Sequence, residues 1–215
     1  DFEATHVRPE RLMKTLFTDE AYVKANVDEA RLMRRLFDLA CNMQSHDTDM
    51  QLYSLFTDEE CYDLWSCNNL YWYLTHACSP VTDGLMPYRE ADLLRNILDR
   101  ADAALKEGKN QATLRFGHES CLLPLVALLE LNHYGESYPD VEKLSEQWRA
   151  YDIFPMASNV QFVFFHKKGS NDVLVKVLLN EKEAKLPVKT DVAPYYHWKD
   201  VESYYREKLD KYQHI

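Results

Sequence analysis

The first half of the chain has the periodicity of helices. Between residues 19 and 43, apolar side chains recur every three or four residues, as Val23 and Val27 illustrate. This spacing places the apolar side chains on one helical face, so it predicts a helix over the whole range. The sequence TDEE at Thr57–Glu60 has the form of a capping box. A second, aromatic-rich helix is therefore expected from this box to Ala77.

The pattern changes after a further helix, which is predicted between residues 88 and 107. A loop with two prolines and a glycine, at 79–87, precedes this helix, and Gly108 follows it at a position where glycine commonly ends helices. Beyond this glycine, the residues at 112–116 predict a short strand. The residues at 119–131 predict an apolar helix.

The last third of the chain contains the segments with the strongest strand character. Residues 158–168 and 172–180 are rich in β-branched and aromatic side chains, and Gly169–Asn171 separates them. This arrangement predicts a β-hairpin. A short edge strand is expected at 184–188, which contains a proline. An amphipathic helix is expected at 197–212.

This succession of elements predicts an α+β fold, mostly helical, with a small sheet that includes a hairpin. Residues 19–110 are expected to form a helical subdomain. Residues 1–18 and 111–215 are expected to form the sheet-containing portion. A strand followed by a histidine and a helix is typical of a larger α/β sheet, so this portion is expected to be part of one.

Charge and hydrophobicity limit the possible binding partners. The 215 residues carry a net charge of −10, with an isoelectric point near 5.3, which argues against general nucleic-acid binding. A small phosphorylated substrate remains compatible, because a local cluster of cations can hold an anion on an acidic protein. No apolar run approaches the roughly 20 residues that a membrane span needs.

The sequence offers no recognisable metal motif. None of the five cysteines forms a C-x-x-C pair, and most are expected to be small buried hydrophobic residues. An H-E-x-x-H motif starting at His118 would need a histidine at position 122, where the chain has Leu122. We therefore expect neither a metal site nor a cofactor.

His118 and Glu119 are the strongest candidates for chemistry. They follow Gly117 between the predicted strand and the apolar helix, where ligands bind in α/β sheets and where helix N–H groups favour an anion. An imidazole can donate to phosphate oxygens, and a carboxylic acid can protonate a leaving alkoxide. The same spacing also fits a structural role, in which His118 caps the helix and Glu119 interacts with the helix dipole.

The segment TLRFGHESCLLPLVALL at 113–129 resembles the second catalytic motif of the histidine phosphatase superfamily. The resemblance is greatest to the branch of acid phosphatases, phytases and multiple inositol polyphosphate phosphatases. Members of that branch have a strand, then Gly-His-Asp or Gly-His-Ala-Glu, then an apolar helix. The run VLVKVLLNEKEAKLPV at 173–188 is similar to the late hairpin and edge strand of that branch. The resemblance implies an α/β phosphatase that hydrolyses phosphomonoesters, such as inositol polyphosphates, through a phosphohistidine.

The resemblance also implies roles for individual residues. His118 would be the second active-site histidine and would contact phosphate, while Glu119 would be the general acid. Here Glu directly follows His, where one branch has Asp and another has Ala and then Glu, so the reach of the acid differs. Arg115 fits a phosphate ligand and a salt-bridged surface residue equally well.

A second segment, ATHVRPERLMKTLF at 4–17, resembles the part of the family that supplies a phosphate-binding arginine, with Arg11 in that place. An arginine suits this role because its planar fork binds phosphate through two hydrogen bonds. The alternative is that Arg8, Arg11 and Lys14 share a solvated helix face.

The nucleophile motif of the family, Arg-His-Gly-x-Arg-x-Pro, occurs nowhere in these 215 residues. We expect the chain to be the C-terminal portion of a longer phosphatase, inactive alone, whose partner is the missing N-terminal portion. A strand from that portion would lie beside residues 112–116. Otherwise the exposed edge would drive association into a homo-oligomer. Because the family is often exported, a periplasmic or secreted location is expected.

The alternative function is a non-catalytic helical binding module that engages a partner through aromatic faces. Its contact residues would be Tyr62, Trp65, Tyr71 and Trp72. The same side chains would otherwise form core. A mutase of the same superfamily would differ from a phosphatase only in returning the phosphate to its substrate.

Overall fold

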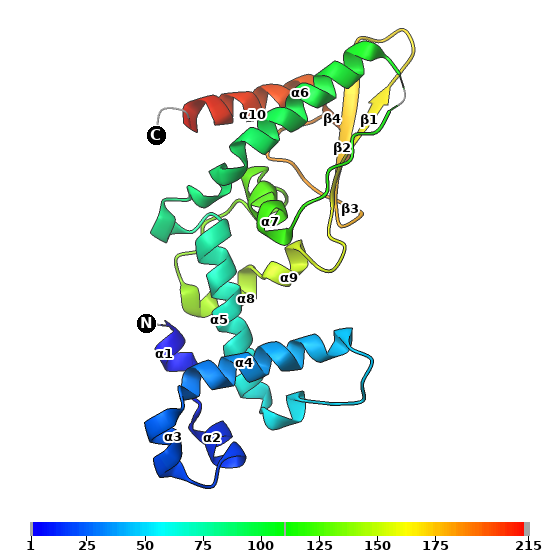
Figure 1. Cartoon of the computed structure of the whole chain (residues 1–215). Coiled ribbons are helices and arrows are strands. Elements are labelled where there is room, and N and C mark those ends of the chain that lie inside the picture. The colour runs from blue at the N-terminus through cyan, green and yellow to red at the C-terminus, as the bar shows by residue number, and fades with distance from the viewer. Residues whose placement is uncertain (1, 110, 213–215) are drawn as a thin grey trace. The chain divides into compact units, whose positions relative to one another are not determined.

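The computed structural model describes residues 2–109 and 111–212 (Figure 1). It is mostly helical, with one small antiparallel sheet, which confirms the predicted α+β class. The chain divides into two compact units, Asp1–Tyr71 and Trp72–Ile215, each of which is described by itself. The predicted division into a helical subdomain and a phosphatase-core portion stays a prediction.

Unit 1 is entirely helical in its regular structure. Its elements are α1 (Phe2–His6), α2 (Glu10–Leu16), α3 (Glu20–Asn26), α4 (Glu29–Asn42), the short 3-10 helices η1 (Met43–Ser45) and η2 (Tyr53–Leu55), and the first part of α5 (Asp58–His76). Its core contains Leu12 from α2, Met33 from α4 and Leu64 from α5, all of them buried. Burial of these apolar faces is the main driving force that holds the unit together.

The single helix predicted from 19 to 43 is wrong, because the chain forms α3 and α4 with a break between them. At the break, Val27 has extended backbone angles, and the carboxylate of Asp28 accepts a hydrogen bond from the backbone N–H of Arg31 at 3.1 Å. Asp28 thus caps a new helix. The apolar spacing continues across the break because α3 and α4 each bury an apolar helical face.

The capping box at the start of α5 is confirmed. The Thr57 hydroxyl accepts from the backbone N–H of Glu60 at 3.2 Å, and the Glu60 carboxylate accepts from the backbone N–H of Thr57 at 2.9 Å. The helix then runs to His76, close to the predicted end. These reciprocal bonds satisfy two of the N–H groups that a helix start leaves unpaired.

Unit 2 surrounds α7 with short helices, a sheet and two long helices. Its helices are η3 (Pro80–Thr82), η4 (Met86–Glu90), α6 (Ala91–Glu107), α7 (Glu119–Leu128), η5 (Val141–Lys143), α8 (Leu144–Gln147), α9 (Ala150–Ile153) and α10 (Trp198–Tyr212). Its strands are β1 (Val160–His166), β2 (Val173–Leu179), β3 (Lys182–Glu183) and β4 (Tyr196–His197). The helix predicted from 88 to 107 is present as η4 and α6. It ends at Gly108, whose φ of +64° is the left-handed conformation that glycine adopts readily.

The predicted hairpin is confirmed, and the predicted edge strand at 184–188 is wrong. β1 pairs antiparallel with β2, and β2 also pairs with β3 and β4. Beyond β3, the backbone N–H of Leu186 donates to the Tyr196 hydroxyl at 3.0 Å instead of to a strand. Pro187 has no N–H to offer a neighbour, so the edge ends early.

The strand predicted at 112–116 is also wrong in this structure. Residues 111–118 form neither helix nor strand, and Figure 1 shows them as an extended run from the region of α6 to α7. The side chains of Leu114 and Phe116 are 74% and 94% exposed. An isolated strand needs a neighbour to accept its backbone hydrogen bonds, and within 2–109 and 111–212 no strand pairs with this segment.

The helix predicted at 119–131 is present as α7, which begins at Glu119 as predicted but ends three residues early, at Leu128, and its body is buried. Every residue from Leu123 to Leu129 is buried, and the helix packs against η4 and α9. This burial fixes the direction of the helix and therefore the position of its first residues. Over the described parts of the chain, no helix combines the length and the hydrophobicity that crossing a bilayer requires.

Candidate functional site

His118 stands at the N-cap of α7 without capping the helix through its side chain. Its backbone is extended, with φ −104° and ψ 163°, and its carbonyl oxygen accepts from the N–H groups of Cys121 and Leu122 at 3.0 and 3.1 Å. The imidazole makes no capping hydrogen bond and is exposed. The His118 side chain therefore does not cap the start of α7, in contrast to the alternative in which this residue has only a capping role.

Glu119 is the first residue of α7, and its side chain is exposed. Among the described residues, neither His118 nor Glu119 has a side-chain hydrogen bond or ion pair. The first N–H groups of a helix point out of its start and carry partial positive charge, which favours an anion there. The arrangement thus offers an imidazole, a carboxyl group and backbone donors at one accessible place.

A buried histidine lies close to this start. His76, the last residue of α5, is 7% exposed; its ring lies against Trp72, with ring centroids 4.7 Å apart, and its Nδ1 is 2.7 Å from the Thr75 hydroxyl. Burial lowers the pKa of His76, the positive charge of Arg89 lowers it further, and the negative charge of Glu119 opposes them. Burial thus favours the neutral form of His76, which lies within the electrostatic field of both charged side chains.

Sequence reasoning missed His76 and Arg89. They stand 42 and 29 residues before His118 in the sequence. No local motif therefore connects either residue with His118. The only local signal is the proline-containing loop before Arg89, which marks a change of chain direction without indicating where the chain goes. Arg89 is brought toward Glu119 by the packing of η4 against α7, and the charges of Arg89 and Glu119 both act on the His76 ring at the end of α5.

Arg115 lies three residues before His118 in the extended segment. Its Nη2 donates to the side-chain oxygen of Asn96 on α6 at 2.7 Å. Because that partner is neutral, the bond leaves the charge of Arg115 uncompensated by any carboxylate of the described residues. A phosphate-binding role for Arg115 stays a prediction.

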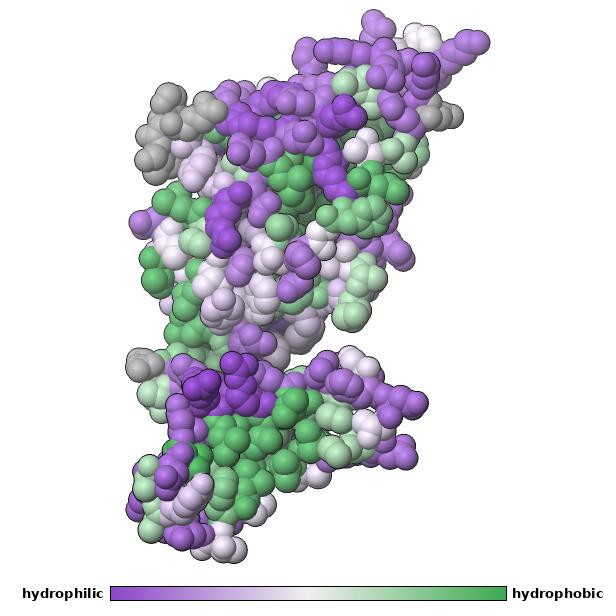
Figure 2. Space-filling model, in the orientation of Figure 1, coloured by the Kyte–Doolittle hydropathy of each residue, from purple (hydrophilic) through white to green (hydrophobic). Residues whose placement is uncertain are grey.

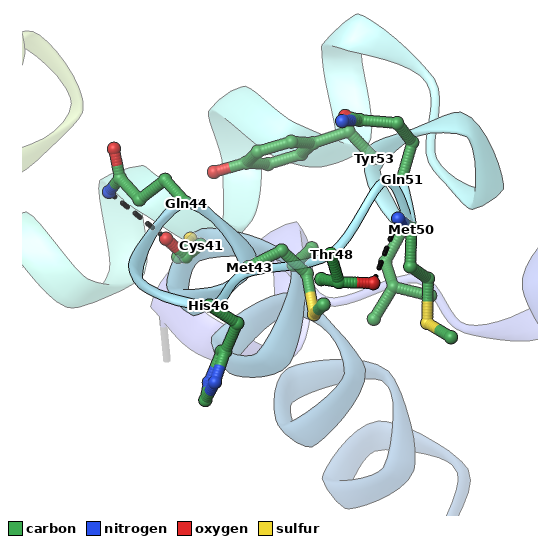
Figure 3. Close-up of a pocket in the computed structure, with 10 residues that line it drawn as sticks. Cys41, Met43, Gln44, His46, Thr48, Met50, Gln51 and Tyr53 are labelled. Atoms are coloured by element: carbon green, nitrogen blue, oxygen red, sulfur yellow. Dashed lines mark hydrogen bonds between the residues drawn. The ribbon is translucent and has the colours of Figure 1, made fainter.

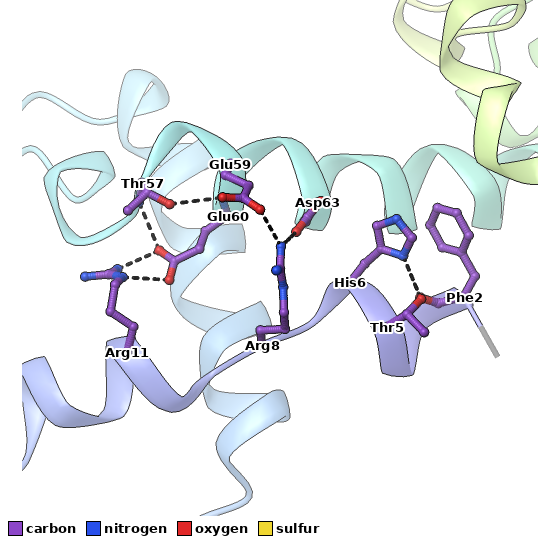
Figure 4. A network of polar contacts seen from close by, with 9 residues as sticks. All are labelled: Phe2, Thr5, His6, Arg8, Arg11, Thr57, Glu59, Glu60 and Asp63. Carbon is purple, nitrogen blue, oxygen red and sulfur yellow. Dashed lines mark hydrogen bonds and ion pairs between the residues drawn. The ribbon is translucent and has the colours of Figure 1, made fainter.

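Arg11 is engaged by a carboxylate of unit 1 (Figure 4). Its Nε and Nη2 donate to the two oxygens of Glu60 at 2.7 and 2.5 Å, and Nη2 also donates to the carbonyl of Leu55 at 2.6 Å. Burial raises the pKa of Glu60, but the hydrogen bonds from Arg11 and Thr57 outweigh it and hold that pKa below its usual value. Arg11 therefore has a protein carboxylate where the resemblance implies a phosphate, and its substrate-binding role stays a prediction.

Arg8 belongs to the same network. Its Nη2 donates to Glu59 at 2.8 Å and to Asp63 at 2.6 Å (Figure 4). Asp63 is buried, so Arg8 supplies the countercharge that its carboxylate needs there. Arg8 and Arg11 thus tie the N-terminal segment to α5 rather than lying on a purely solvated face.

Unit 1 also contains a cavity of about 280 Å³ between the end of α4 and η2 (Figure 3). Its lining residues are Ala40, Cys41, Met43, Gln44, His46, Thr48, Met50, Gln51, Leu52 and Tyr53. A hydrogen bond with Cys41, followed by burial, raises the pKa of Tyr53 to about 12. No Lys or Arg is among these lining residues, so the cavity does not have the permanent cations that phosphate recognition uses.

A comparison with models of protein families identifies the class to which this fold belongs. Residues 6–180 match the model of the histidine phosphatase superfamily (branch 2). The chain belongs to this superfamily.

Relatives in this superfamily carry inositol phosphatase names. The chain is 28% identical over 134 residues to human multiple inositol polyphosphate phosphatase 1, a match that covers 56% of this chain and 27% of the human protein. Among solved structures, the Bifidobacterium longum multiple inositol polyphosphate phosphatase in complex with phosphate aligns with a TM-score of 0.70 at 22% identity, over 84% of this chain and 40% of that one. The complex of that protein with inositol hexasulfate gives a TM-score of 0.66 at 22% identity, over 82% and 38%.

The similarity in structure shows that the fold is shared. The chain spans 27% of the length of the human relative and about two fifths of the bacterial one.

Proposed function

We propose that this chain is the part of a histidine phosphatase that supplies the phosphate-contacting histidine and the general acid. The complete protein would hydrolyse phosphomonoesters, with inositol polyphosphates as the substrate class. One observation carries the proposal: His118 and Glu119 stand at the start of a buried helix with exposed side chains that have no hydrogen-bond or ion-pair partner among residues 2–109 and 111–212. An exported location, which the family resemblance favours, is part of the same proposal.

In the proposed reaction, His118 donates a hydrogen bond to a phosphate oxygen. A histidine nucleophile outside these 215 residues attacks phosphorus, and the bond between phosphorus and the ester oxygen breaks. Glu119, in its acid form, gives its proton to that departing oxygen and releases an alcohol. Water then attacks the phosphohistidine, releases inorganic phosphate and restores the histidine, while Glu119 regains a proton.

We propose that the polypeptide carrying this nucleophile also completes the sheet. Its strand would pair with residues 112–116, whose backbone has no partner strand among the described residues. The exposed side chains of Leu114 and Phe116 would then become buried. Two observations support this: the nucleophile motif is absent from the 215 residues, and the chain spans only part of its relatives.

Binding of inorganic phosphate or vanadate tests the site directly in the 215-residue chain. We expect either anion to raise the melting temperature of the wild type, because a ligand that binds only the folded state stabilises it. His118→Ala should remove this protection. His46→Ala, which changes the cavity of unit 1, is the matched control and should keep it. Equal protection in the His118→Ala variant would refute the proposed site.

Turnover tests the chemical roles. The 215-residue chain alone should not hydrolyse phosphate esters, whereas the chain extended by its natural upstream sequence should. In the extended protein, Glu119→Gln should lower kcat by roughly 10²-fold or more while phosphate still binds, because only proton delivery is removed. Robust turnover by the 215 residues alone would contradict the division of roles.

A binding module is the second candidate, and one surface favours it. Figure 2 shows hydrophobic residues gathered over α4 on the visible face of unit 1. Leu39 of α4 is 53% exposed. Tyr62 and Tyr71 on α5 are also more than half exposed, at 53% and 57%. If no anion protects the chain while Leu39→Ser or Tyr71→Ser abolishes binding to a protein partner, this function replaces the first.

A further inference from the structure

We propose that Arg89 is a second phosphate-binding residue of the site at the start of α7, acting together with His118. This inference rests on the proposed function and names a ligand of the same site. Arg89 would add to the site a permanent cation from η4, in addition to Arg115, which lies three residues before His118 in the sequence.

The first argument is the placement of Arg89 on a fixed support. It is the fourth residue of η4, which packs closely against α7. Within η4, Pro87 is buried. The part-buried Glu90 accepts a hydrogen bond from Cys121, which lies in the first turn of α7. The backbone of Arg89 is therefore held beside the helix start, while its side chain is exposed.

The second argument is electrostatic proximity. The buried imidazole of His76 lies in the fields of both Arg89 and Glu119, which act on it in opposite directions. Two charges that both act on one buried ring lie in the same neighbourhood. Arg89 and Glu119 do not form an ion pair with each other among the described contacts, so the charge of Arg89 is not neutralised by Glu119 and remains available to an anion.

The third argument is that the Arg89 side chain forms no ion pair in the described residues, although burial raises the pKa of the neighbouring Glu90 carboxyl group and the charge of Arg89 acts on that group to lower it. Elsewhere in unit 2, Arg95 binds Asp210, Arg149 binds Asp152, and Arg206 binds Asp99, Asp102 and Glu202. In the described residues, Arg89 has no hydrogen bond or ion pair through its side chain. On a chain with a net charge of −10, an exposed arginine that is not held in an ion pair of the described residues fits, together with His118, a site for a doubly charged anion.

The test measures binding of inorganic phosphate to the 215-residue chain by calorimetry at low ionic strength. We expect Arg89→Gln to weaken binding by about tenfold or more, the loss typical of one charge-assisted hydrogen bond. Arg89→Lys should lose less, because the charge remains while the planar fork is lost. The matched control is Arg100→Gln, which removes an exposed arginine of α6 and should bind phosphate like the wild type.

A second measurement checks the placement independently of any ligand. In NMR titrations, Arg89→Gln should raise the pKa of His76 toward its ordinary value of 6.5, and Glu119→Gln should lower it further. Arg100→Gln should leave it unchanged. Thermal melts show whether each variant is folded. If Arg89→Gln does not fold, the Arg89→Lys variant still provides the test.

The outcomes separate this inference from the proposed function. If His118→Ala abolishes phosphate binding but Arg89→Gln and Arg89→Lys bind like Arg100→Gln, the role of Arg89 is refuted and the proposed function stands. If the wild type does not bind phosphate, or if His118→Ala binds it as well as the wild type, both are refuted. A tenfold loss in Arg89→Gln together with complete loss in His118→Ala supports both.

Discussion

The starts of α5 and α7 both carry polar side chains, but these side chains are paired within the protein at α5 and lack described partners at α7. At α5, Thr57 and Glu60 bond each other's backbone, and Glu60 also binds Arg11 through both carboxylate oxygens. At α7, the side chain of His118 caps nothing and that of Glu119 has no described partner. Polar groups at a helix start stabilise the fold when they are paired within the protein. When they are left unpaired, they are available to a ligand.

The largest expected effect in this comparison concerns the two glutamates. Glu60→Ala should lower the free energy of unfolding by roughly 2 kcal/mol, because it removes a charge-assisted pair and one half of the capping box. Glu119→Ala should change it by less than about 0.5 kcal/mol, as for an exposed residue without partners. Urea denaturation of both variants measures the difference. Equal losses would show that Glu119 is also structural.

The N-cap residues should differ in the same direction, with a smaller effect. Thr57→Ala should cost about 1 kcal/mol, the usual value for losing a capping hydroxyl. His118→Ala should leave stability within about 0.5 kcal/mol, since its imidazole bonds no backbone group. Thermal melts without phosphate provide the measurement. A loss near 1 kcal/mol in His118→Ala would instead show that the His118 side chain caps the helix.

The pH dependence of stability should carry a contribution from His76. Because its pKa is lower in the folded protein than the ordinary value of 6.5, the unfolded chain binds the additional proton as pH falls. Its stabilising contribution is therefore present above pH 6.5 and is lost as the pH falls from there toward the folded pKa. Denaturant titrations at several pH values should show this slope in the wild type. His76→Gln should flatten it, and an unchanged slope would contradict the burial argument.

The smallest effect on stability is expected in the segment before α7. Phe116→Ser should leave the melting temperature almost unchanged, because the ring is 94% exposed. The same change should reduce any self-association of the 215-residue chain, since it removes an exposed apolar side chain beside an unpaired backbone edge. Sedimentation at several concentrations tests this. Strong destabilisation would mean that the ring packs against the fold in solution.

Sequence reasoning worked best where the signal is local. The capping box at Thr57, the helix end at Gly108 and the hairpin around Gly169 depend on neighbouring residues, and each is present. The break at Asp28 was missed because apolar spacing continues through it. The strand at 112–116 was predicted from composition, but a strand exists only with a neighbour.

The candidate site shows the same limit. His118 and Glu119 are adjacent in sequence, so a motif could indicate them. His76 and Arg89 come from α5 and η4, and only the packing of the folded unit brings them near Glu119. For Arg11, the sequence shows a cation but not the Glu60 carboxylate that binds it.

The extended run before α7 also makes the chain vulnerable to cleavage at one defined place. Proteases bind their substrates as exposed, extended backbone, and an enzyme that cuts after aromatic residues would find Phe116 fully presented. The cut would fall two residues before His118 and separate it from everything upstream. Slower cutting after Phe116 when another polypeptide is added would then report whether that polypeptide covers this site.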